Sequence, residues 1–169
     1  VADDGKLTAG KPAQAIEDRI AQVTQEAYDN GDYIFVAMDR HDEGDTFHPE
    51  TKLFPPHNIA GTSGRELYGK LAGVYDAIKD DHRVFWMDKR HYSAFSGTDL
   101  DIRLRERRVT TVVLTGVLTD ICVLHTAIDA YNLGYDIEVV ESATASLTPE
   151  AHDFAIGHFK NVLGATIVE

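Results

Sequence analysis

The lone cysteine of the chain, Cys122, is the residue best suited to nucleophilic chemistry. The apolar run from Val109 to Leu114 predicts a buried strand, and the residues from Asp120 onward predict a helix. Cys122 would then lie in the first turn of that helix, where free backbone N–H groups and the helix dipole favour an anion. We therefore expect a lowered thiol pKa and a thiolate nucleophile. The alternative is a buried cysteine with a structural role only.

A long polar loop in the first half of the chain carries a second group of chemically useful side chains. Asp39 and His41 lie two residues apart just past a predicted strand, so both can point the same way. Glu50 and His57 follow in the same loop, and the set would suit zinc, manganese or iron with positions left open for a substrate. His48 is a competing ligand, and a solvated acidic loop is the alternative to a metal site.

Lys89 ends the second apolar run and would lower the pKa of a thiol within its reach. A solvated lysine at a sheet edge is the alternative. Phe54 and Tyr92 supply aromatic surface that could line the same edge, or they pack in the core.

These residues must be positioned by an alternation of strands and helices. Strands that are apolar throughout and separated by helices predict a mostly parallel sheet covered on both faces, a three-layer α/β/α fold. The loops after the first three strands then share one sheet edge, where ligands bind in such folds. The strands are predicted at 33–38, 83–87, 109–114, 136–140 and 165–168. The helices are predicted at 12–30, 64–78 and 99–108, from Asp120 and from Pro149, where Thr148 is the expected cap.

Length and composition predict one domain spanning residues 1–169. The formal net charge of −12 argues against nucleic acid and anionic membrane surfaces as partners. One cysteine rules out an internal disulfide and suits a reducing, cytoplasmic setting. No apolar segment has transmembrane length.

Together these motifs resemble the isochorismatase-like cysteine hydrolases, and within them the nicotinamidase (pyrazinamidase) branch. The resemblance covers essentially the whole chain. It rests on Asp39-x-His41 with His57 downstream, on Lys89 in MDKRHYSAF and on Cys122 in TGVLTDICV.

The resemblance implies an Asp-Lys-Cys triad in which Lys89 and Cys122 supply two members. The triad aspartate is expected upstream of Val1, at the end of a first strand that precedes it in the working protein. The oxyanion hole is implied to be the N–H groups of Leu118 and Cys122, next to a cis peptide between Val117 and Leu118.

The resemblance also implies two sets of contacts around the triad. The substrate would meet Phe54, Tyr92, Val117 and Leu118. The metal would be held by Asp39, His41, His57 and Glu50.

The implied activity is hydrolysis of nicotinamide to nicotinate and ammonia through a thioester, a step of NAD salvage, with zinc, or else manganese or iron, as cofactor. Pyrazinamide is a possible second substrate, and a homo-oligomer is implied. One alternative is another amidase of this superfamily that acts on a carbamoyl or ureido compound, and a second is a catalytically inactive metal-binding scaffold. A thiol redox sensor is disfavoured because the chain has no resolving cysteine.

Overall fold

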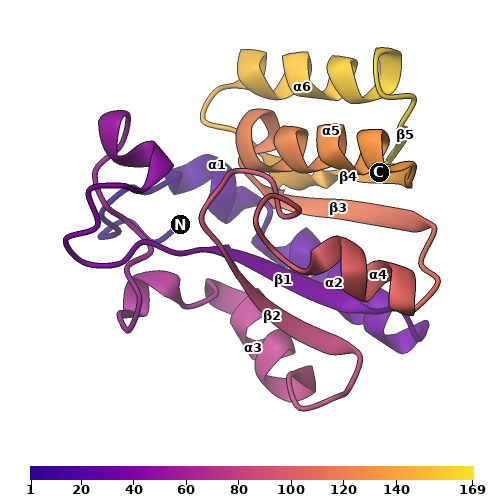
Figure 1. Ribbon diagram of the computed structural model, residues 1–169, viewed down its shortest axis with the longest axis horizontal. Helices are drawn as coiled ribbons and strands as arrows, with labels where there is room; N and C mark the ends of the chain where they lie inside the picture. The colour runs from indigo at the N-terminus through magenta and orange to yellow at the C-terminus, as the bar shows by residue number, and fades with distance from the viewer.

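The computed structural model describes residues 1–169 and has an α/β fold with parallel strands, as the sequence predicts (Figure 1). The helices are α1 (Gly10–Ala15), α2 (Glu17–Asp29), α3 (Gly69–Ile78), α4 (Leu100–Glu106), α5 (Leu124–Leu133) and α6 (Pro149–Asn161). The strands are β1 (Ile34–Asp39), β2 (Val84–Lys89), β3 (Thr111–Val117), β4 (Asp136–Ala145) and β5 (Thr166–Val168). Short turns η1 (Pro49–Lys52), η2 (Ser63–Arg65) and η3 (Thr119–Val123) complete the chain. No helix combines the length and the apolar character needed to span a bilayer.

All strand pairs are parallel, and they form two sheets. β1 pairs with β2 in a register that sets Asp39 opposite Lys89. In the other sheet β3 pairs with β4 and β4 with β5, and Val117 lies opposite Ala145. Because parallel strands end at one edge, the residues after β1, β2 and β3 converge there.

The main core lies between β4 and the helices α4, α5 and α6. Leu104, Ala127 and Phe159 of these helices share one buried cluster with Val139 of β4. Val140 is buried outside that cluster, as the alternation of a strand requires. α1 and α2 both contact β4, and α2 also packs on α3. Figure 1 shows α4 and α5 in front of the strands and α2 behind β1.

Several predicted boundaries are wrong. The first predicted helix is interrupted at Ile16, so that α1 and α2 are separate. α3 begins at Gly69 instead of Gly64, after the separate turn η2. β4 continues to Ala145 because its second half pairs with the end of β3 across a register shift. The start of α6 is confirmed, with the Thr148 hydroxyl accepting a hydrogen bond from the N–H of Ala151.

Candidate active site

Cys122 lies in the π-helical turn η3, between the end of β3 and the start of α5. The expectation that it occupies the first turn of an α-helix is therefore wrong. π-Helical turns occur mostly as single turns and are frequent at functional sites. The N–H groups of Ile121 and Val123 both donate to the carbonyl oxygen of Leu118, each at 3.2 Å. The carbonyl oxygen of Cys122 accepts a hydrogen bond from the Thr126 hydroxyl at 2.7 Å, so both ends of the turn are held.

Lys89 joins Cys122 to Asp39 across the sheet edge. Its side chain is 5% exposed, and its Nζ lies 3.7 Å from Cys122 Sγ. The same ammonium donates to the Asp39 carboxylate and, at 3.0 Å, to the carbonyl oxygen of His91. Pairing of β1 with β2 places Asp39 and Lys89 side by side, and the turn after β3 brings the sulfur to them.

The expected low pKa of the Cys122 thiol is contradicted. Burial raises the pKa of Cys122 to about 11, and the negative charges of Asp39 and Glu50 add to the effect. The nearby Lys89 ammonium lowers the pKa of the thiol but does not outweigh them.

Lys89 itself stays charged despite its burial. Desolvation acts to lower the pKa of Lys89, but the negative charges of Cys122 and Asp39 outweigh it and raise that pKa above the usual value. The site therefore holds a buried cation next to the sulfur, an arrangement that favours thiolate character as it develops during attack.

A second cluster joins His41, Glu50 and His57, all of them buried. The ligand atoms of these three residues lie within 4.8 Å of one another. Glu50 Oε2 is 3.6 Å from His57 Nε2 and 3.9 Å from His41 Nε2. Ligand atoms around a tetrahedral zinc are about 3.4 Å apart, so a small contraction would close the cluster on an ion.

The hydrogen bonding of these side chains fits a metal. His57 Nδ1 lies 3.0 Å from the carbonyl oxygen of Pro55, which can only accept, so Nε2 keeps its lone pair free. Both ring nitrogens of His41 are buried without a partner. Burial lowers the pKa of His41 to about 4, helped by His57 and His48, so the imidazole is neutral and able to bind an ion. Desolvation and the charge of Asp39 raise the pKa of Glu50, and a bound cation would offset both.

The two other candidate ligands lie beside this cluster. Asp39 is outside the group of mutually close ligand atoms and is engaged with Lys89, although its charge acts on both His41 and Glu50. His48 stacks on His41 with ring centroids 3.8 Å apart. Its Nδ1 accepts a hydrogen bond from the backbone N–H of Glu50, and its Nε2 is buried without a partner.

The residues expected to contact a substrate come from three separate segments of the chain. Burial is the main cause of the raised pKa of Tyr92. The charges of Glu50, Cys122 and Asp39 lie close enough to raise that pKa further. Val117 and Leu118 directly precede η3, and the peptide bond between them is cis, as the resemblance implies. Phe54 closes η1 by donating its N–H to the carbonyl oxygen of Glu50.

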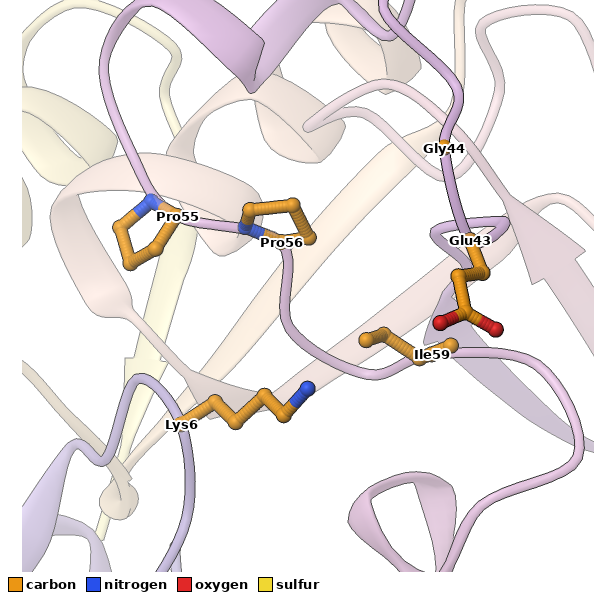
Figure 2. Close-up of a pocket in the computed structure, with 6 residues that line it drawn as sticks. All are labelled: Lys6, Glu43, Gly44, Pro55, Pro56 and Ile59. Carbon is orange, nitrogen blue, oxygen red and sulfur yellow. The ribbon is translucent and has the colours of Figure 1, made fainter.

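A hollow of about 460 Å³ lies beside the loop that carries the histidines (Figure 2). Pro55, Pro56 and Ile59 form one wall, and the side chain of Lys6 extends along the opposite side. Ile59 also forms a parallel bridge to His41. Neither Cys122 nor Lys89 lines this hollow, so it is separate from the nucleophile.

An arginine network that was not predicted from the sequence ties the polar loop to β2. Arg65 donates to the backbone carbonyl of Asp39 at 3.2 Å and to the carboxylate of Asp88. Arg40 donates to Asp42 and Asp88. The partners are up to 48 residues apart, and no local pattern marks such pairs.

Comparison with known proteins identifies the family. The model of the isochorismatase domain matches residues 5–168. The chain belongs to the isochorismatase family. The family resemblance expected from Asp39-x-His41, Lys89 and Cys122 is thereby confirmed.

Solved structures of this family superpose closely on the chain. A pyrazinamidase/nicotinamidase from Streptococcus mutans UA159 is 80% identical with a TM-score of 0.97, covering 99% of this chain and 92% of that one. The nicotinamidase/pyrazinamidase PncA from Bacillus subtilis is 53% identical with a TM-score of 0.98, covering 100% and 92%. A pyrazinamidase of Pyrococcus horikoshii in complex with zinc is 26% identical with a TM-score of 0.80, covering 93% and 86%.

Proposed function

We propose that this protein is an amidase that hydrolyses nicotinamide to nicotinate and ammonia, with Cys122 as the nucleophile. The observation that carries this proposal is the 3.7 Å approach of the buried Lys89 ammonium to the only sulfhydryl of the chain. The buried cluster of His41, Glu50 and His57 is close enough for Glu50 to act on the thiol pKa. The close likeness to nicotinamidases supports the choice of substrate. The nicotinate formed would serve NAD salvage.

His41, Glu50 and His57 would hold a divalent metal, which we propose to be zinc because a related pyrazinamidase binds it. Asp39 is the proposed fourth ligand, since its charge already acts on two members of the cluster. The metal would supply a Lewis acid that binds the pyridine nitrogen and fixes the ring. The two unpartnered nitrogens of His41 support an ion at this position.

The chemical step requires the thiol to lose its proton as its sulfur bonds to the carboxamide carbon. Lys89 is the group near enough to stabilise the forming thiolate. As the sulfur–carbon bond forms, the Lys89 ammonium gives one proton to the carboxamide nitrogen and takes up the thiol proton in the same step, and the C–N bond of the tetrahedral intermediate then breaks. Ammonia leaves and a thioester on Cys122 remains. Water then adds its hydroxyl to the acyl carbon and returns a proton to the sulfur, so nicotinate is released and the thiol is restored.

The oxyanion of the tetrahedral intermediate would be held by the backbone N–H groups of Leu118 and Cys122. Removal of one such donor typically raises the activation barrier by about 2.7–4 kcal/mol. We further propose that Tyr92, Phe54, Val117 and Leu118 enclose the pyridine ring. The position of Tyr92 near the charges of the site supports its assignment.

The nucleophile is tested by Cys122→Ala and by Cys122→Ser. We expect both variants to fold and to release no ammonia from nicotinamide above background, because oxygen in the serine variant is a weaker nucleophile at this site. Ammonia release is measured by a coupled assay and folding by circular dichroism. Turnover retained in the alanine variant would overturn the assignment.

The metal is tested by chelation, add-back and metal analysis. Chelation should abolish turnover and stoichiometric zinc should restore it, with zinc content following activity. His57→Ala should lower the zinc content and raise KM at least as much as it lowers kcat. His82→Ala, whose side chain is 87% exposed, is the matched control and should retain zinc. Full activity in a metal-free preparation would exclude the proposed role.

The substrate assignment is tested by a panel of amides. Nicotinamide and pyrazinamide should release ammonia, and their kcat/KM should exceed that of a carbamoyl or ureido compound of similar size. The reverse order would assign the chain to a different amidase activity of the same family.

A further inference from the structure

Two side chains from the last third of the chain hold the first two residues of η3. The hydroxyl of Thr119, a fully buried residue, lies 2.9 Å from Nδ1 of His152 on α6. The hydroxyl of Ser146, in the loop between β4 and α6, donates to the carboxylate of Asp120. Neither contact involves the metal cluster or Lys89.

We propose that His152 is a positioning residue for the nucleophile segment, acting through Thr119. The inference rests on the proposed function, in which Cys122 attacks the substrate carbon. Thr119 is the first residue of η3 and follows Leu118, whose N–H is a proposed oxyanion donor. A shift of this residue would therefore move the donor and the sulfur together.

Later residues of η3 are held by short side-chain contacts, from Thr126 Oγ1 to the carbonyl oxygen of Cys122 at 2.7 Å and from His125 Nδ1 to that of Ile121 at 2.8 Å. The carbonyl oxygen of Leu118 accepts from two N–H groups, each at 3.2 Å, which is the long end of the normal range. The hydrogen bond between His152 and the buried Thr119 hydroxyl adds a restraint at the residue where the turn begins. Displacement of a reacting group by about 1 Å can cost about 100-fold in rate, so a weak restraint here has a large kinetic consequence.

His152 is itself held in place from two sides. It lies in the first turn of α6, where its N–H donates to the carbonyl oxygen of Thr148 at 3.1 Å. Its Nε2 is 4.0 Å from Oε1 of Glu141 on β4. His152 and Ser146 both line a hollow of about 260 Å³ at the carboxyl end of β4. Truncation of His152 would therefore enlarge an open hollow and not a sealed core, and we expect the variants to fold.

The test compares variants that keep the hydrogen-bonding atom of the contact between His152 and Thr119 with variants that remove it. Asparagine can place a polar atom where Nδ1 lies, whereas glutamine places one where Nε2 lies. His152→Ala, His152→Gln and Thr119→Val should lower kcat by about 10-fold to 100-fold with KM changed by less than about twofold. His152→Asn and Thr119→Ser should stay within about threefold of the parent protein. His158→Ala, on the same helix, is the control and should leave kcat unchanged.

A second measurement reports on the nucleophile without any substrate. Because the chain has a single cysteine, the rate of alkylation by iodoacetamide measures Cys122 alone. His152→Ala and Thr119→Val should change this rate in the same direction and by the same factor. The double variant should equal the single variants, because both remove one contact.

The outcomes separate a failure of the proposed function from a failure of the proposed role of His152. Failure of the parent protein to hydrolyse nicotinamide would overturn the proposed function, and the alkylation series would still test the positioning role. Equal activity of the asparagine and glutamine variants, or losses that multiply in the double variant, would overturn the role of His152. Should the alanine variant not fold, the Asn/Gln and Ser/Val pairs decide alone.

Discussion

Replacement of Lys89 by methionine removes the one cation that contacts the thiol and keeps most of the side-chain volume. Lys89 holds the carboxylate of Asp39 and lies 3.7 Å from Cys122 Sγ. Without it, the burial and negative charges that already raise the pKa of Cys122 act unopposed. We expect the thiol to become less acidic and the thiolate-like transition state to lose its nearest stabilising charge.

The magnitude follows from the geometry. A unit charge 3.7 Å from a thiolate contributes about 4.5 kcal/mol at an effective dielectric constant of about 20. That energy corresponds to about three pKa units. Asp39 shares the same ammonium and reduces its field at the sulfur, so the expected loss in kcat/KM is about 10²-fold to 10³-fold.

The assay uses ammonia release together with alkylation of Cys122 between pH 7 and pH 10. Lys89→Met should slow alkylation, whereas Asp39→Asn should speed it, because Asp39 raises the pKa of the thiol. Lys79→Met is the matched control, since Lys79 forms an exposed pair with Asp76. An exposed pair of this kind contributes little to stability, and activity should be unchanged.

Stability must be measured in parallel. Lys89→Met leaves the half-buried Asp39 carboxylate without its partner, at a cost of about 3 kcal/mol in the free energy of unfolding. The double variant with Asp39→Asn should recover stability without recovering turnover. Alkylation and turnover within about threefold of the parent protein in a folded Lys89→Met variant would refute the proposed electrostatic role of Lys89.

Two further predictions concern the scaffold. Hydrogen bonds from Arg83, and a smaller contribution from Tyr28, lower the pKa of Asp81 in the folded state. The stabilising effect of the Asp81 carboxylate is therefore present above about pH 4 and is lost as the pH falls below that value. Asp81→Asn should flatten this loss of stability in acid, which is measured as urea unfolding midpoints at pH 7, 4.5 and 3. Gly69→Ala would place a Cβ 2.1 Å from Oε1 of Glu17 at a positive φ, and we expect urea unfolding to show a loss of about 1–3 kcal/mol. A substitution at Gly44, where the φ is positive but nothing lies within 4 Å, should cost less, and equal losses would contradict the steric reasoning.

Local sequence signals predicted the order of elements because each signal acts within a few residues. The cap and proline at Thr148–Pro149 fix the start of α6, and apolar runs fix the strands. The break at Ile16 was missed because the apolar spacing continues across it. The extension of β4 to Ala145 was missed because it depends on pairing with β3.

The candidate active site, like the fold, could be predicted from the sequence only in part. The types of its side chains, the single thiol, the Asp-x-His pair and the lysine at the end of a strand, are fixed by the sequence and point to one family. Only the tertiary structure decided that the Cys122 thiol has a raised pKa, that Asp39 binds Lys89, and that His152 reaches Thr119. The physical reason is that burial and Coulomb interactions depend on which segments meet in space, and Lys89 meets a sulfur 33 residues away.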